Sequence, residues 1–266
     1  MRRLGLFAVL LTLYAGPAKA CGLALALLVD ISGSVDPREY RIQIDGLAAA
    51  LRDGTVADAL IRQNAAVTLI QWTGASRQEI SLGWTRIDNS DALERFARQV
   101  EAVERPWAMF ATAIGEALSI AETALSAAPD CDRQVIDVSG DGASNEGIDP
   151  GEVRDRLAAN GVTINALVIT GSEPNLLAYF ENEVIGGANA FAIAANGYGE
   201  YPERIRRKLI RETASAVSQM IPGAESPIPM DARGQRRHPA HAVITSCKFV
   251  ITIADFPCHR ANSPRP

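Results

Sequence analysis

Short apolar-rich runs alternate along this chain with segments whose apolar residues recur every three or four positions. Residues 23–29 form the first such run, which is typical of a strand buried on both faces, as in a parallel sheet under helices. Further strands are predicted at 66–72, 78–84, 133–139, 162–169 and 190–194, where polar residues interrupt the apolar ones. Helical spacing and start signals predict intervening helices after Asp36-Pro37, Ser90, Thr112, Asp149-Pro150, Asn175 and Pro202.

This alternation of strands and helices predicts an α/β fold. We expect a doubly wound, Rossmann-type architecture, with a mostly parallel six-stranded sheet and helices on both faces. Ligands of such folds bind at the carboxyl ends of the strands. Polar residues that directly follow a strand are therefore the first candidates for a functional site.

The two ends of the chain differ in composition from its middle. Residues 1–20 combine Arg2-Arg3, an apolar stretch too short to span a membrane, and the cleavage pattern Ala18-Lys19-Ala20, which predicts a signal peptide. We expect a periplasmic or secreted protein with no stable membrane insertion once the signal is removed. Residues 222–266 hold seven of the 14 prolines and carry a net charge of +3, which is typical of a disordered tail.

Two ordered alternatives remain for the tail. One is a short strand at 248–256, closed by a Cys247–Cys258 bridge. The other is a metal site that uses the tail cysteines with His238, His241 and His259, although their spacing fits no zinc pattern.

Residues 21–221 are expected to form one domain. They carry 17 Lys+Arg and 28 Asp+Glu, a net charge of −11, which disfavours nucleic acid as a partner. They contain no histidine, which excludes a Ser-His-Asp or Cys-His catalytic site within this segment. Because a P-loop and a G-x-G-x-x-G after the first strand are also absent from the sequence, we expect no enzyme. A hydrolase that uses metal-bound water is the remaining enzymatic alternative.

Three polar segments lie where such a fold places its ligands. Asp30-Ile31-Ser32-Gly33-Ser34 follows the first strand and offers a carboxylate and two hydroxyls at alternate positions. Thr112 opens a helix after a long loop, which alone indicates an ordinary helix cap. Asp141-Gly142 follows the fourth strand, which alone indicates a turn. Oxygen atoms of this kind suit a hard cation such as Mg²⁺.

The order of these three segments resembles the metal-ion-dependent adhesion site of the von Willebrand factor A (integrin I-like) domain family. That site consists of D-x-S-x-S, a threonine and Asp-Gly on three successive loops. The resemblance covers residues 22–221 and includes the helix start Ile114-Gly115-Glu116-Ala117-Leu118. The chain looks most like a bacterial subgroup of exported proteins of unassigned function. It departs from the family at Phe110-Ala111, where many members have glycines.

The resemblance implies a metal site formed by Asp30, Ser32, Ser34, Thr112 and Asp141, with Mg²⁺ or Mn²⁺ as the cofactor. The two serines would bind the metal directly, the threonine directly or through water, and the aspartates through waters or by orienting the hydroxyls. Such a site captures an exposed Asp or Glu of a partner protein. We therefore expect a metal-dependent protein-interaction module of adhesion type. A structural or assembly component with a stabilising metal is the main alternative.

The resemblance also makes the first and fourth strands parallel neighbours. Cys21 lies nine residues before Asp30, and Cys131 lies ten residues before Asp141, so both cysteines would lie at the metal-distal end, within bridging distance. We expect a disulfide between them. The alternative is a lipoprotein acylated at Cys21, for which the preceding Ala18-Lys19-Ala20 is a poor signal.

Two further features remain open from the sequence. Asp137 lies inside the fourth predicted strand. Its carboxylate either accepts hydrogen bonds or faces the start of a helix, or it contacts and orients the residues that bind the metal. The apolar loop 106–110 is either packed against the domain or an exposed anchor for a partner.

Overall fold

Six strands form one sheet in the order β3-β2-β1-β4-β5-β6. The computed structural model describes residues 20–171 and 173–214. All neighbouring strands are parallel except β2 and β3, which pair antiparallel at one edge. The strands are β1 (Ala24–Asp30), β2 (Ala65–Trp72), β3 (Gln78–Ile87), β4 (Gln134–Gly140), β5 (Thr163–Ile169) and β6 (Ala192–Ala195).

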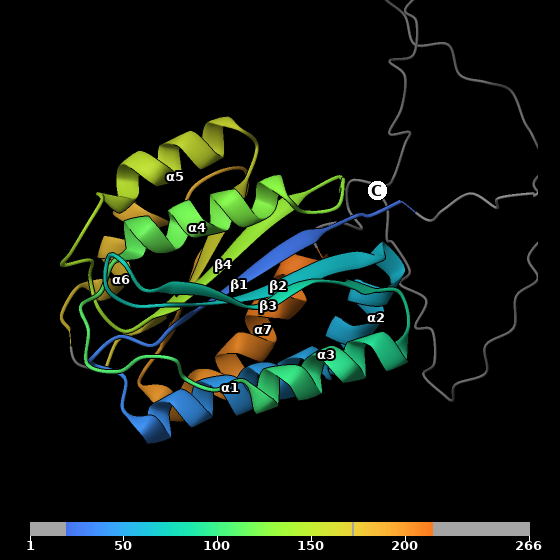
Figure 1. Cartoon of the computed structure of the whole chain (residues 1–266), viewed down its shortest axis with the longest axis horizontal. Helices are drawn as coiled ribbons and strands as arrows, with labels where there is room; N and C mark the ends of the chain where they lie inside the picture. Colours follow the sequence, from blue (N-terminus) through green and yellow to red (C-terminus); the bar gives the residue numbers. More distant parts are fainter. Residues whose placement is uncertain (1–19, 172, 215–266) are drawn as a thin grey trace, which may run out of the picture. The chain divides into compact units, whose positions relative to one another are not determined.

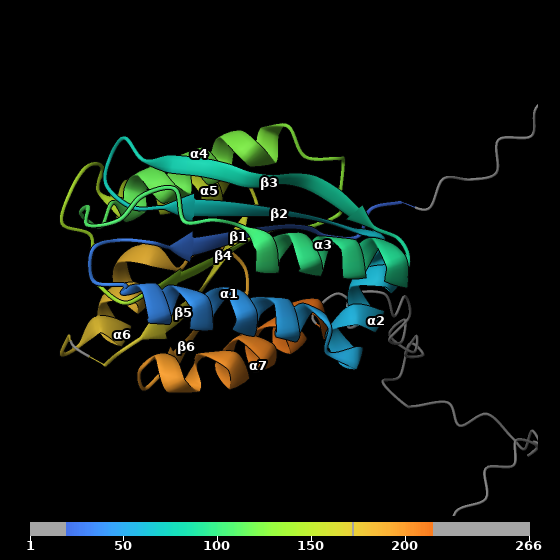
Figure 2. The same cartoon turned by 60° about the horizontal axis from the view of Figure 1, so that its bottom comes forward.

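Helices cover both faces of this sheet. They are α1 (Pro37–Leu51), α2 (Gly54–Gln63), α3 (Ser90–Ala102), α4 (Ile114–Ser126), α5 (Pro150–Ala159), α6 (Leu176–Tyr179) with its π-helical continuation η1 (Phe180–Val184), and α7 (Tyr201–Ala214), which follows the 3₁₀ turn η2 (Tyr198–Glu200). Figure 1 and Figure 2 show α4 and α5 on one face and α1, α2, α3 and α7 on the other. The doubly wound α/β fold expected from the sequence is confirmed.

The central strand β1 contributes to two hydrophobic cores. Leu25 and Leu27 pack in the core under α1, α3 and α7, whereas Ala26 and Leu28 pack in the core under α4 and α5. Every residue of β1 and β2 is buried. A strand that is covered on both faces has no position for a polar, solvent-facing residue, which explains the unbroken apolar run of β1.

The start of α1 follows the capping signal in the sequence. The Asp36 side chain accepts hydrogen bonds from the backbone N–H groups of Arg38 and Glu39, and the Glu39 carboxylate accepts one from the Asp36 N–H. This capping box satisfies donors that the first turn leaves without helical partners. Asp149 begins α5 in a similar way by accepting a hydrogen bond from the Gly151 N–H.

Some elements differ from the sequence-based expectations. Helix α2 was not predicted, because Asp53-Gly54 was interpreted as a helix end; Asp53 instead caps α2 by accepting from the Thr55 N–H at 2.9 Å. The cap of α3 is Asn89 rather than Ser90, since the Asn89 side chain accepts from the Ala92 N–H at 2.9 Å. Strand β3 also continues to Ile87, beyond the predicted end at residue 84.

Several expectations lie outside the described residues. They are the signal peptide apart from Ala20, the tail at 222–266 with its alternatives at His238, His241, His259 and Cys247–Cys258, and the last predicted helix beyond Ala214. The domain boundaries therefore stay predictions. Within the described ranges, no helix combines the length and apolar character needed to span a bilayer.

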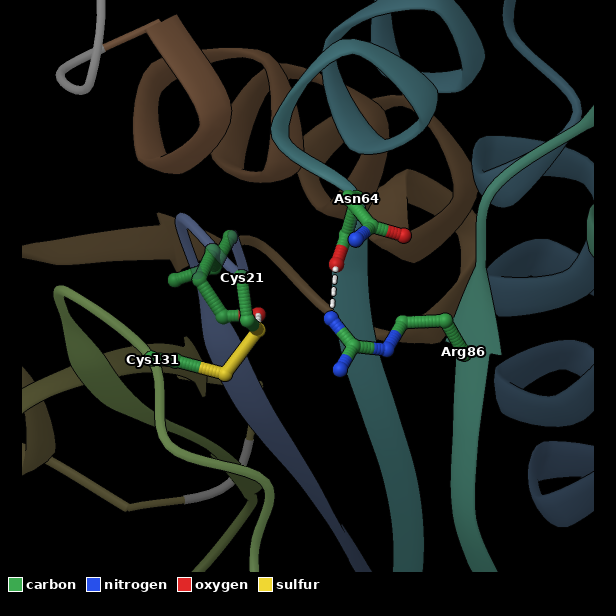
Figure 3. Close-up of a disulfide and its surroundings, with 5 residues drawn as sticks. Cys21, Asn64, Arg86 and Cys131 are labelled. Atoms are coloured by element: carbon green, nitrogen blue, oxygen red, sulfur yellow. Dashed lines mark hydrogen bonds between the residues drawn. A yellow bond between two sulfur atoms is a disulfide. The ribbon is translucent and has the colours of Figure 1, made fainter. Parts of the chain in front are cut away.

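Cys21 and Cys131 form a disulfide at one end of the sheet, shown in Figure 3. Their Cα atoms lie 4.4 Å apart, and the two residues form a parallel bridge that continues the register of β1 with β4. The expected disulfide is confirmed, and it leaves no free thiol for acylation at Cys21. The same close-up shows Arg86 of β3 donating to the carbonyl oxygen of Asn64 at 3.2 Å.

A buried charge cluster joins α7 to β4. The Lys208 ammonium lies 2.5 Å from a carboxylate oxygen of Asp137 and 2.6 Å from one of Glu212, and all three side chains are at most 3% exposed. Asn165 of β5 donates to the same Glu212 carboxylate at 2.8 Å. Asp137 thus forms an ion pair with α7 through one oxygen, rather than a contact with a helix start or with the predicted metal site, while its Oδ2 atom has no hydrogen-bond partner.

The disulfide gives a stability prediction. Its cysteines are 110 residues apart in the chain, and a cross-link that closes a loop of about 100 residues restricts the unfolded state by ~4–5 kcal/mol. Cys131→Ser should therefore lower the free energy of unfolding of the oxidised protein by up to about that amount, as measured by denaturant titration. Dithiothreitol should cause a similar loss in the wild type, with no comparable loss in the variant. A free thiol at Cys131 in non-reducing peptide mapping would contradict the bridge.

Candidate functional site

The carboxyl ends of β1 and β4 lie side by side and lead directly into two loops with predicted site residues. β1 ends at Asp30, with Ser32 and Ser34 in the loop that follows, and Asp141 comes directly after β4. Asp30, Ser32 and Asp141 are buried, whereas Ser34 is exposed. The site therefore lies at the edge of the sheet opposite the disulfide.

Thr112 enters the same edge from the loop before α4. It does not cap this helix, because the cap position is Ala113, and the first N–H of the helix, that of Ile114, donates to the Ser144 hydroxyl at 3.2 Å. The ordinary-cap interpretation is wrong. The backbone of Thr112 instead exchanges two hydrogen bonds of 2.9 Å with Asn145, in the loop after β4. Its hydroxyl oxygen lies 3.8 Å from the position that a Cβ on Gly142 would occupy.

Hydrogen bonds connect four of the predicted residues. The Asp30 carboxylate accepts from the Ser32 N–H at 2.7 Å, and the hydroxyl oxygens of Ser32 and Ser34 lie 3.1 Å apart. The Ser34 hydroxyl donates to Asp141 Oδ1 at 2.5 Å. Together with Thr112 beside Gly142, all five predicted site residues come together at one edge of the sheet.

Asp30 occupies an unfavourable position for an isolated carboxylate. It is 0% exposed, and its Oδ2 atom has no hydrogen-bond partner. Burial and the negative charge of Asp141 raise the pKa of Asp30 to about 7. A Cβ on Gly140 would lie 3.3 Å from that oxygen and 3.2 Å from the Phe180 ring, so the fit around the carboxylate is tight.

The donor atoms fit a hard divalent cation. Among the described residues, no group of three or more His, Cys, Asp or Glu side chains is arranged to hold a metal. The site instead combines two carboxylates with three hydroxyls, and such oxygen donors suit Mg²⁺ and Mn²⁺ better than softer metals. A cation would also offset the repulsion between the two buried carboxylates.

Three residues that the sequence analysis did not identify hold the site in place. The Tyr198 hydroxyl, from η2, donates to Asp141 Oδ2 at 2.9 Å, and the Arg105 guanidinium donates to the carbonyl oxygens of Ile31 and Ser32, each at 2.9 Å. Gln43 of α1 donates to the Asp30 carbonyl oxygen at 3.1 Å. Only Gln43 had a signal in the sequence, because it is a polar residue on the buried face of a predicted helix.

The loop at 106–110 both packs against the domain and exposes apolar side chains. Trp107 is partly buried against the core under α1 and α3, whereas Met109 is 83% exposed and Phe110 is 37% exposed. The Phe110 carbonyl oxygen accepts a hydrogen bond of 2.7 Å from the Gly33 N–H. This hydrogen bond holds the loop that leads to Thr112 against the loop that carries Ser32 and Ser34.

Comparisons with known proteins place the chain in a family. Residues 20–217 match a family profile described as "Protein of unknown function (DUF1194)". A search among curated proteins finds no match. Solved structures, however, share the fold over most of the described chain.

Three solved structures illustrate this similarity. Proximal thread matrix protein 1 (PTMP1) from the mussel byssus matches with a TM-score of 0.57 and 19% identity, over 73% of this chain and 48% of that one. A von Willebrand factor type A protein from Catenulispora acidiphila has a TM-score of 0.52 and 14% identity, over 73% and 43%. The PilB minor pilin from Streptococcus sanguinis has a TM-score of 0.58 and 13% identity, over 78% and 65%.

These matches show the fold but not the activity. The identities are below 20%, and the chain spans about half to two thirds of the length of the matched proteins. A further structure of the mussel protein is described as having a zinc-occupied MIDAS motif, with a TM-score of 0.53 and 18% identity. The chain therefore belongs to the DUF1194 family, and its fold is that of a von Willebrand factor A domain.

Proposed function

We propose that this protein is an exported, metal-dependent interaction module of adhesion type, which binds an acidic group of a partner protein through Mg²⁺ or Mn²⁺. The observation that carries the proposal is the buried, unpartnered Asp30 oxygen beside a chain of hydrogen bonds from Ser32 through Ser34 to Asp141. This group lies at the carboxyl edge of the sheet, where folds of this class bind ligands.

In this proposal the residues have different roles. Ser32 and Ser34 hold the metal directly, and Thr112 holds it directly or through a water. Asp30 and Asp141 orient the serines, because they already accept hydrogen bonds from the Ser32 N–H and the Ser34 hydroxyl. A divalent cation held mainly by neutral hydroxyls keeps much of its charge and therefore favours an anionic ligand, such as an Asp or Glu side chain.

Export is supported by the predicted signal sequence and by the disulfide. A Cys21–Cys131 bridge persists in oxidising compartments such as the periplasm or the extracellular space. The net charge of −11 over residues 21–221 further disfavours nucleic acid and anionic membrane surfaces as partners. A protein partner with an exposed acidic residue agrees best with these properties.

A structural or assembly role for the protein is the second candidate. Two proteins of the same fold are named as a thread matrix protein and a minor pilin, which favours a component of an extracellular assembly. In this alternative the metal mainly stabilises the fold. A metal-dependent hydrolase has no comparable observation in its favour.

Metal removal separates the two candidates. In the experiment, the full chain is immobilised and incubated in Mg²⁺ with an extract of the organism that produces it. If the metal bridges to a partner, EDTA should release the retained proteins, while circular dichroism shows that the chain itself stays folded. EDTA should lower the melting temperature in both cases, because a bound ligand stabilises the native state; if the metal mainly stabilises the fold, protein that is still folded in EDTA should keep its partners. Retention of partners by folded protein in EDTA would contradict the adhesion proposal.

Loss of the two serine hydroxyls should abolish metal binding. Ser32→Ala combined with Ser34→Ala removes both direct ligands, whereas the fold should persist because the burial of β1 does not depend on these hydroxyls. Isothermal titration with Mg²⁺ measures the effect. The matched control removes two serine hydroxyls from α4, with Ser119→Ala and Ser126→Ala, and should keep wild-type affinity. Unchanged Mg²⁺ binding in the site variant would show that the metal assignment is wrong.

Tyr198→Phe should weaken Mg²⁺ binding without removing a ligand. The substitution deletes the 2.9 Å hydrogen bond that orients Asp141, and loss of such a supporting contact typically costs about 10–100-fold in metal affinity. Tyr40→Phe is the control, because it removes a tyrosine hydrogen bond of 3.1 Å whose acceptor is the Val103 carbonyl oxygen rather than a site carboxylate. Equal Mg²⁺ affinities in the two variants would argue against a role for Tyr198 in the site.

A further inference from the structure

An exposed apolar platform lies next to the candidate metal site. It consists of Met109, whose side chain is 83% exposed, and Phe110, which is 37% exposed. In the described residues the other exposed large apolar side chains are Ile80 and Ile148, at 42% and 44%. Single exposed apolar residues are normal on protein surfaces. Here two adjacent ones, including the most exposed of the set, form a small apolar patch.

The backbone holds this platform in a defined conformation. Met109 has a φ angle of 65°, a left-handed conformation that is uncommon for residues other than glycine. The following residue fixes it in place: the Phe110 carbonyl oxygen accepts from the Gly33 N–H at 2.7 Å, and the Arg77 guanidinium lies 3.6 Å from the centre of the Phe110 ring. Strained residues persist where their surroundings determine the conformation, and they cluster at functional sites.

The platform borders the two serines that the proposed function assigns to the metal. Gly33 lies between Ser32 and Ser34, and a Cβ at this glycine would be 3.4 Å from the Met109 Cα and 3.1 Å from the Phe110 carbonyl oxygen. A carboxylate bound at the serines would therefore have the Met109–Phe110 backbone nearby, with the exposed Met109 side chain within reach of its neighbouring atoms. Apolar atoms of the partner next to that carboxylate would be removed from water when they contact the Met109 side chain, and this burial favours binding.

We propose that the Met109–Phe110 platform makes the site select partners whose metal-binding carboxylate is accompanied by an apolar group within a few bonds. This inference rests on the proposed function, since it specifies the partner of the same metal site. The recognised element is an Asp or Glu with an apolar neighbouring residue, rather than an acidic residue within a polar or charged stretch.

A series of simple carboxylates provides the probe. Acetate, butyrate and hexanoate carry the same acidic group with increasing apolar length. Binding to the full chain loaded with Mn²⁺ is measured by the paramagnetic broadening of their proton NMR signals, which suits weak ligands. A methylene that leaves water completely is worth about fourfold in affinity. For an open surface we expect roughly twofold per methylene, so hexanoate should bind on the order of tenfold more tightly than acetate.

Met109→Asn tests the platform itself. Asparagine tolerates a positive φ angle, so the loop should keep its conformation while the apolar surface is lost. The variant should bind Mn²⁺ and acetate as the wild type does, but its preference for hexanoate should fall to about twofold. Ile80→Thr is the matched control: it removes an exposed apolar side chain from β3, two strands away from β1, and should keep the full preference.

The outcomes distinguish this inference from the proposed function. Mn²⁺ and acetate binding without any preference for longer chains would overturn the inference and leave the metal site intact. A preference that persists in Met109→Asn would also overturn it, because the apolar contact would then lie elsewhere. If Mn²⁺ fails to bind the full chain at all, the proposed function fails, and the inference fails with it.

Discussion

The parallel pairing of β1 with β4 in one fixed register is the constraint on which the rest of the structure depends. The same offset of 110 residues places Cys21 opposite Cys131 at one end and Val29 opposite Ser139 near the other, so Asp30 and Asp141 emerge together at the carboxyl edge. Both faces of β1 are buried, and a slip by one residue would exchange its two apolar faces. The disulfide and the candidate site thus lie at opposite ends of the same β1–β4 strand pair and depend on the same register.

The candidate site combines this rigid alignment with contacts from remote loops. The ends of β1 and β4 provide the carboxylates, while Arg105 fixes the carbonyl groups of the first loop and Tyr198 fixes the Asp141 carboxylate. Asp30 remains buried with one oxygen lacking a partner, which is costly in a protein interior. Departures from the ordinary rules of folding are expected at functional sites, and here the departure coincides with the oxygen donors that suit Mg²⁺.

Most of the fold could be predicted because its signals are local. Buried strands appear as apolar-rich runs, most clearly in β1, and capping residues such as Asp36 and Asp149 mark helix starts. Helix α2 was missed because Asp53-Gly54 serves equally well as a helix end or a helix start. The five site residues were identified from a motif order, whereas Tyr198 and Arg105 were not, because their contacts exist only after distant loops close. For the same reason, the sequence could not reveal that Asp137 pairs with Lys208.

The central claim is that hydroxyl groups at this edge bind a divalent cation, and X-ray diffraction from crystals of the full chain soaked in Mn²⁺ tests it most directly. The account predicts an anomalous peak at the carboxyl edge of β1, at a coordination distance of about 2.0–2.3 Å from the hydroxyl oxygens of both Ser32 and Ser34. A peak elsewhere on the protein, or none at this edge in saturating Mn²⁺, would contradict the account.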